Sequence, residues 1–86
     1  MAKAIMTNTR HSKVFPGLIL EFQATDRGLF LTFKSGVAWD CYSLIDGVAV
    51  LCDCSDRFAM PTLEERHCRK VAGAYARKFH STKRTA

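Results

Sequence analysis

The sequence contains no apolar run of the roughly 18 residues that a membrane-spanning helix needs. It also lacks the apolar segment of a signal peptide near its start, because residues 7–11 (TNTRH) are all polar. Neither internal repeats nor low-complexity segments occur. These absences predict a cytoplasmic protein with no membrane partner, in which cysteine thiols stay reduced.

Composition and charge are those of one small globular domain with a basic surface. Hydrophobic residues make up 48% of the 86 residues and charged residues 24%, which argues against wholesale disorder. Thirteen Lys and Arg against eight Asp and Glu give a formal net charge of +5. This balance favours an acidic partner such as nucleic acid, although a basic surface also serves solubility.

Alternation of apolar and polar side chains predicts four strands joined by short turns. The expected strands are residues 14–23 (after a break at Pro16-Gly17), 29–34, 37–44 and 48–53. Asp46-Gly47 is typical of a two-residue type I′ hairpin, which needs positive φ at both positions. With that turn, Cys41 is expected directly across from Cys52, on the same face of the ribbon.

Residues 63–79 are expected to form the only long helix. Thr62 followed by Glu65 matches a capping box at its start. Its apolar stripe consists of Cys68, Val71, Ala72, Tyr75 and Phe79. The predicted fold is α+β, a four-stranded antiparallel β-meander with one C-terminal α-helix packed on one face. The expected organisation is a flexible N-terminal arm (1–12), a single domain (13–80) and a basic tail (81–86).

Three thiols and an imidazole are the most chemically suggestive group in the chain. Cys52 and Cys54 form a C-x-C pair, and His67-Cys68 lie near the predicted helix start. Zinc takes four thiolate or imidazole ligands, often two from a knuckle and two from a helix start. The glycine turn, short strand, C-x-C pair and helical cysteine, over residues 37–74, resemble a SWIM zinc finger.

The resemblance implies a structural zinc site, but Lys70 stands where the family has its fourth ligand, a histidine. Either His67 or Cys41 would have to complete the coordination. The second choice gives the set Cys41, Cys52, Cys54 and Cys68. The alternative is that the thiols only fill the core, because free cysteine behaves as a small hydrophobe. A thiol-based sensor is a third interpretation.

No grouping of residues indicates catalysis, so the protein is predicted not to be an enzyme. His67 and Cys68 are neighbours on a helix, which does not create a nucleophile with its base. Three aspartates near the cysteines are expected to form a solvated rim, namely Asp40, Asp53 and Asp56.

Basic residues on the polar side of the predicted helix are the second functional candidate. They are Arg66, Arg69, Lys70, Arg77 and Lys78, and the tail adds Lys83 and Arg84. Such a face can contact phosphates, although a solvated face opposite a core stripe gives the same pattern.

These observations favour a small regulatory module that contacts nucleic acid or a nucleoprotein complex through the helix, with zinc as its one candidate cofactor. The alternative is a phage-type inhibitor or adaptor that binds a host protein through its sheet face or edge without metal. Either activity suits a small viral protein. Open strand edges also favour a homodimer or a bound partner.

Overall fold

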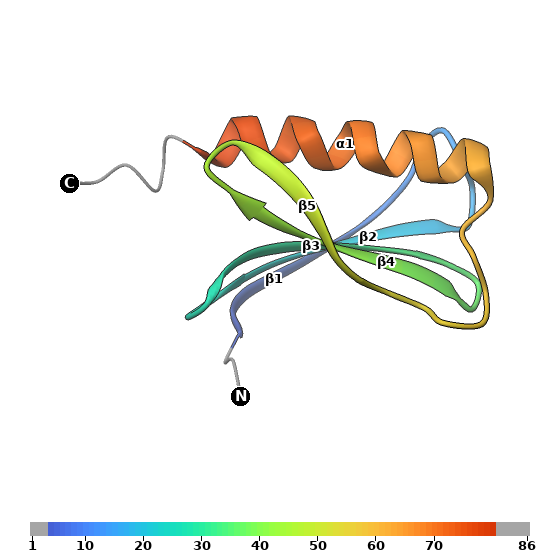
Figure 1. The fold of residues 1–86 in the computed structure, drawn as a ribbon, viewed down its shortest axis with the longest axis horizontal. Helices are drawn as coiled ribbons and strands as arrows, with labels where there is room; N and C mark the ends of the chain where they lie inside the picture. The colour runs from blue at the N-terminus through green and yellow to red at the C-terminus, as the bar shows by residue number, and fades with distance from the viewer. Residues whose placement is uncertain (1–3, 81–86) are drawn as a thin grey trace.

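The computed structural model describes residues 4–80, which form an antiparallel sheet and one helix (Figure 1). The elements are β1 (Ala4–His11), β2 (Leu18–Thr25), β3 (Gly28–Ser35), β4 (Ala38–Ile45), β5 (Val48–Cys54) and α1 (Thr62–His80). The sheet order is β1-β2-β3-β4-β5, so each strand pairs with its neighbours in the chain. The prediction of an α+β meander with a C-terminal helix is confirmed, with five strands instead of four.

The first strand corrects the prediction of a flexible arm over residues 1–12. Ala4–His11 forms β1, which pairs antiparallel with β2 and places His11 opposite Ile19. The side chains of residues 6–11 are all exposed, so no apolar alternation marks this strand in the sequence. Backbone pairing with β2 holds it in the sheet instead. The predicted basic tail, 81–86, lies outside the described residues.

The core lies between one face of the sheet and α1. Successive side chains of a strand point to opposite faces, and one of the two sets is buried here. The buried cluster consists of Leu18, Leu20, Phe22, Leu31, Phe33, Tyr42, Leu44, Met60, Cys68, Ala72 and Ala76. Phe33 meets Tyr42 edge-on with ring centroids 5.8 Å apart, and Phe22 stacks on Phe79 at 4.8 Å.

The start of α1 is fixed to the sheet by a polar contact. The Ser35 hydroxyl at the end of β3 lies 3.1 and 3.2 Å from the two carboxylate oxygens of Glu64. Glu64 and Glu65 lie in the first helical turn, where negative charge suits the helix dipole. This anchors the helix across the sheet. Within the described part of the chain, no helix has the length and apolarity needed to cross a membrane.

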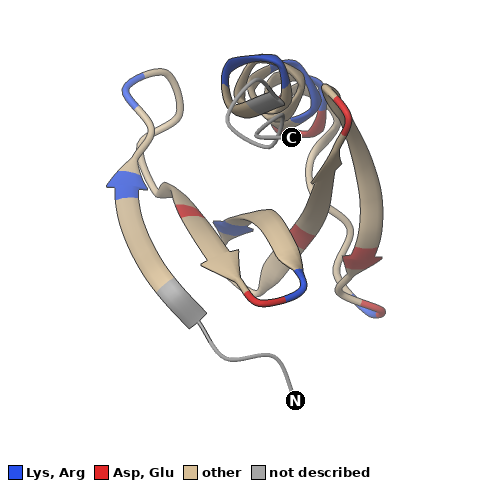
Figure 2. Ribbon diagram, turned by 90° about the vertical axis from the view of Figure 1, so that its left-hand side faces the viewer, with Lys and Arg blue, Asp and Glu red and all other residues tan. Residues whose placement is uncertain are grey.

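One helix is too narrow to cover this sheet. Five strands about 4.8 Å apart span roughly 19 Å, whereas a helix with its side chains is about 10–12 Å wide. α1 packs closest to β4 and β5. The same face of β1 is therefore left open beside the helix, which Figure 2 shows as the separation between α1 and the strand that begins at the N-terminus.

Candidate functional site

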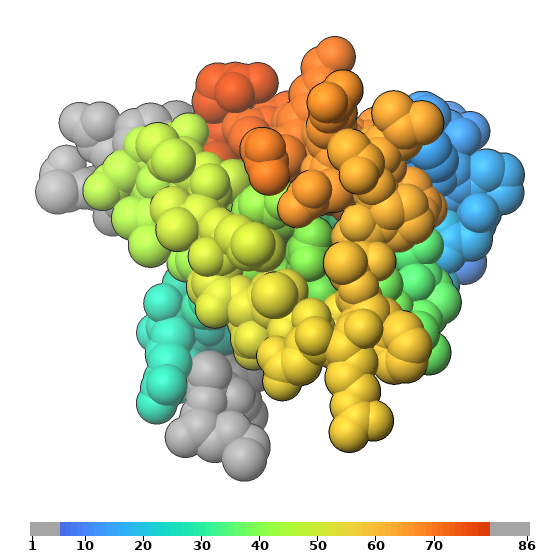
Figure 3. Space-filling view, turned by 45° about the vertical axis from the view of Figure 1, so that its right-hand side comes forward, coloured from blue at the N-terminus to red at the C-terminus, as the bar shows by residue number. Residues whose placement is uncertain are grey.

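Three cations project from the side of α1 that faces away from the sheet. Arg66, Lys70 and Arg77 are all exposed. At about 100° per residue they lie within about 40° of one another and roughly opposite Cys68, which is fully buried. They extend over about 16 Å of the helix axis. These three residues are called the basic stripe, and Figure 3 shows the side chains of α1 projecting from this surface.

The charges of the basic stripe are not neutralised within residues 4–80. The ion pairs described there join Arg69 to Glu65 and Lys34 to Glu21, each at 3.7 Å. Neither involves the stripe, so its three side chains are free to bind an anion.

The two remaining helical cations leave the stripe on opposite flanks. The Arg69 guanidinium reaches towards β4, where burial raises the pKa values of Asp40 and Tyr42 and the nearby Arg69 charge opposes both shifts. The Lys78 ammonium lies over the ring of Phe79, 5.4 Å from its centroid. The predicted basic face therefore divides into one stripe and two flanking residues, and Lys83 and Arg84 lie outside the described residues.

The β4–β5 turn has the predicted geometry. Asp46 and Gly47 both have positive φ, 51° and 80°, and Ile45 pairs with Val48. Near the cysteines, the pairing of β4 with β5 differs from the prediction, because the register shifts farther from the turn.

The prediction that Cys41 lies directly across from Cys52 is wrong. Tyr42 pairs with Leu51 and Cys41 pairs with Asp53, so Cys52 is an extra residue in β5. Such a β-bulge places two residues opposite one and leaves the extra residue outside the ladder. The Cys52 thiol still lies close, and donates a hydrogen bond to the Cys41 carbonyl at 3.4 Å. Burial, followed by the effect of Cys41, raises the pKa of Cys52 to about 11.

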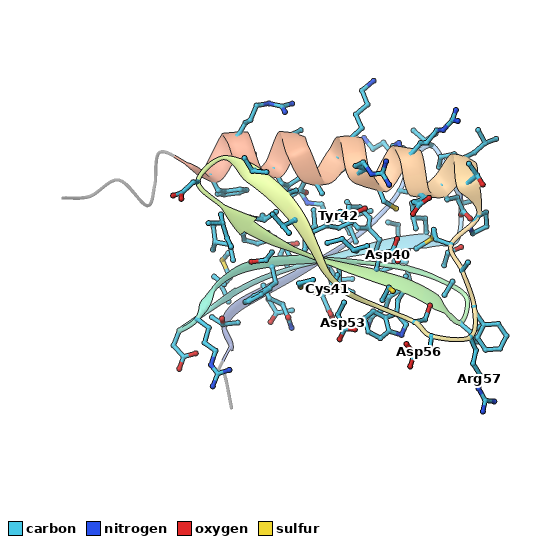
Figure 4. The ribbon with its side chains drawn as sticks, viewed as in Figure 1. Asp40, Cys41, Tyr42, Asp53, Asp56 and Arg57 are labelled. Atoms are coloured by element: carbon cyan, nitrogen blue, oxygen red, sulfur yellow. The ribbon has the colours of Figure 1, made fainter. Side chains whose placement is uncertain are left out.

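Cys68 is separated from Cys41 by the sheet. Asp40 and Tyr42 are buried on the side of the sheet that faces α1. Cys41 lies between them in β4, so its side chain points to the opposite face (Figure 4). Cys68 is fully buried under the helix, and burial followed by Asp40 raises the pKa of its thiol to about 12. The proposed set of four thiolates is therefore not brought together, and Cys54 is exposed at the end of β5.

The alternative ligand, His67, does not indicate a metal site either. His67 packs its ring against Phe15, with centroids 5.3 Å apart. Among the residues that the structure describes, no group of three or more His, Cys, Asp or Glu side chains is arranged to hold a metal ion. Zinc binding stays a prediction.

Sequence reasoning missed a cleft between β1 and the C-terminal half of α1. One wall carries Met6, Asn8 and Arg10 of β1, and the other carries Tyr75, Lys78 and Phe79 of α1. Apolar side chains of β2 and β3 form its floor. Periodicity could not reveal it, because the cleft exists only when β1 joins the sheet.

Comparison with known proteins gives no match to a family model, a curated protein or a solved structure. The resemblance to a SWIM zinc finger therefore depends only on the residues described above. The function has to be inferred from the arrangement of this chain's own side chains.

Proposed function

We propose that the protein is a small non-enzymatic regulatory module that contacts nucleic-acid phosphates through the basic stripe. The observation that carries this proposal is that Arg66, Lys70 and Arg77 share one exposed side of α1 without an ion-pair partner in the described chain. Arginine and lysine on one face of a helix are suited to phosphate oxygens, which they bind as forks and point charges.

The rigidity of α1 supports this role. Its opposite side is held in the core by Cys68, Ala72 and Ala76, which are at most 2% exposed. The cations are thus displayed at fixed spacing on a packed helix, so binding does not require the helix itself to fold. Phosphate contacts position a protein on nucleic acid without reading its sequence. We therefore expect affinity with little sequence preference.

The proposal predicts binding that weakens steeply as salt concentration rises. Three phosphate contacts on duplex DNA should give a slope of about −3 in a plot of log affinity against log salt concentration, because each contact releases counterions. Combining Arg66→Glu, Lys70→Glu and Arg77→Glu should abolish binding. Fluorescence anisotropy with a labelled duplex at several salt concentrations measures both effects.

A matched control separates the effect of the basic stripe on binding from the effect of net charge. Lys13→Glu, Arg27→Glu and Arg57→Glu change three exposed cations away from α1 and alter the net charge equally. This variant should retain most of the affinity and nearly the same salt slope. Equal loss in both triple variants would contradict the proposal, because only overall charge would then matter.

A protein partner is the second candidate, favoured by the β4–β5 hairpin. Ile45, Val48, Val50 and Leu51 are 45–57% exposed, and β5 is an edge strand of the sheet. An apolar edge strand can accept a strand from a host protein or a second copy of the chain. Such binding should depend little on salt and should be lost in Val50→Lys, which pull-down or size-exclusion chromatography would detect.

A further inference from the structure

The β1 wall of the cleft faces α1 because of its pairing with β2. Asn8 pairs with Phe22 and Arg10 pairs with Leu20, and both β2 residues are buried on the helix side. Side chains directly across a strand pair lie on the same face of the sheet. β1 therefore presents an amide and a guanidinium to the cleft, although the helix does not cover them.

The opposite wall combines aromatic rings with a second cation. Tyr75 and Phe79 are partly exposed, and their centroids lie 5.9 Å apart. Both rest on Phe22, whose centroid is 5.9 Å from Tyr75 and 4.8 Å from Phe79. The Lys78 ammonium lies over the ring of Phe79. The cleft thus has an aromatic interior with one cation on each wall.

The charges of the cleft select an anionic occupant. Its charged lining residues are Arg10 and Lys78, and no Asp or Glu lines it. Neither cation belongs to an ion pair described within residues 4–80. The cleft is partly open to solvent: about 80 Å³ of it can be reached by the centre of a water molecule, and about 430 Å³ is empty space that includes the open mouth. A flat ring that carries an anionic group would place the ring among the aromatic side chains and the charge between the cations.

We propose that this cleft binds one unpaired nucleotide of a single-stranded nucleic acid, an inference that rests on the proposed function. The base stacks against Tyr75 beside Phe79, its phosphate lies between Arg10 and Lys78, and the Asn8 amide faces the edge of the base. Aromatic rings and cations together are how single strands are held without sequence preference.

The position of the cleft beside the basic stripe supports this choice of ligand. Lys78 follows Arg77 directly in α1, so one phosphate chain can run from the stripe to the mouth of the cleft. A base within a duplex is stacked and paired, and cannot enter. The protein should therefore bind a single strand more tightly than a duplex, whereas the stripe alone would bind either.

The test compares a short labelled oligothymidine with a duplex of the same length, by fluorescence anisotropy. Tyr75→Leu keeps an apolar side chain but removes the stacking ring, so it should weaken single-strand binding about tenfold and leave duplex binding unchanged. Arg10→Gln, on an exposed edge strand, should weaken the single strand several-fold even if Tyr75→Leu fails to fold. Lys13→Gln removes an equal charge outside the cleft and should have little effect.

The binding measurements distinguish failure of this inference from failure of the proposed function. Equal binding of strand and duplex, with no effect of Tyr75→Leu or Arg10→Gln, would overturn the cleft as a nucleotide site and leave the stripe intact. Absence of binding to either nucleic acid would overturn both proposals. NMR of the Asn8 side-chain amide adds a further test, since a shift with laurate but none with oligothymidine would assign the cleft to an amphiphilic anion instead.

Discussion

Asp40 is the one buried charged residue among those whose side chains the structure describes. It is 6% exposed, and its Oδ2 atom has no hydrogen-bond partner. The prediction of a solvated aspartate rim is therefore wrong at Asp40, although Asp53 and Asp56 are exposed. Asp40 differs from the other two aspartates because it lies in β4 and faces α1. The sequence alternation shows that Asp40 shares a face with Tyr42, but not that the helix covers this face at that point.

Asp40→Asn should stabilise the protein at neutral pH. Burial, and then the charge of Glu65, raise the pKa of Asp40 above its ordinary value of 3.8, despite the opposing charge of Arg69. The folded state thus holds the proton more tightly, so stability is lost as pH rises from 3.8 through the raised pKa. Removing an unpaired buried charge should raise the free energy of unfolding at pH 7 by about 1 kcal/mol.

Urea denaturation measures this effect, with the exposed substitution Asp56→Asn as control. The gain from Asp40→Asn should shrink when the measurement is repeated near pH 4, close to the ordinary pKa of aspartate. A gain that is equal at both pH values, or a gain as large in Asp56→Asn, would show that burial of the Asp40 charge is not its source.

The thiols should differ in chemical reactivity according to their burial. Cys68 has no exposed surface and a thiol pKa of about 12, so iodoacetamide should modify it only after unfolding. Cys52 and Cys54 are exposed and should be modified in the folded protein, Cys52 slowly because its pKa is about 11. Mass spectrometry of peptides from native and urea-treated samples gives the order in which the thiols are modified. Rapid native modification of Cys68 would contradict its described burial.

At the scale of the elements, the sequence predicts a strand best where a burial pattern and a turn residue both mark it. β2 and β4 alternate between buried and partly exposed side chains, and glycines with positive φ precede β4 and β5, so both patterns are visible in the residues. β1 has neither feature. The bulge at Cys52 is also invisible to alternation, because an extra residue in one strand is known only from the register of its partner.

The two glycines Gly47 and Gly73 should respond oppositely to alanine. Gly47 has φ of 80° in the β4–β5 turn, where an L side chain is strained, so Gly47→Ala should destabilise by about 1 kcal/mol. Gly73 lies within α1, and a Cβ atom there would lie 3.5 Å from Arg77 Nη1, an ordinary contact. Gly73→Ala should therefore stabilise by about 0.5–1 kcal/mol. Urea midpoints of the two variants should move in opposite directions. A raised midpoint for Gly47→Ala would contradict the assigned turn, and a lowered midpoint for Gly73→Ala would contradict the expected gain in the helix.

For the whole molecule, the overall architecture was easier to predict than its functional surface. The meander and helix follow from patterns repeated along the chain, so a local error in β1 leaves them intact. The cleft requires β1, the uncovered part of the sheet and the end of α1 to be placed together. Whether the four cysteines can meet depends on the same kind of placement, and Cys41 and Cys68 lie on opposite faces of the sheet.

The arrangement of the core predicts that a chelator will not lower the melting temperature. The buried cluster packs Cys68 among apolar side chains, and Cys41 lies on the opposite face of the sheet, so packing without a metal ion accounts for the position of the helix. Cys54→Ser should likewise change the free energy of unfolding by no more than about 0.5 kcal/mol, because Cys54 is exposed. Thermal melting with and without EDTA, together with metal analysis by mass spectrometry, checks both expectations. One zinc per chain with a chelator-sensitive fold would require Cys68 or its neighbours to rearrange, since folding would then be coupled to metal binding.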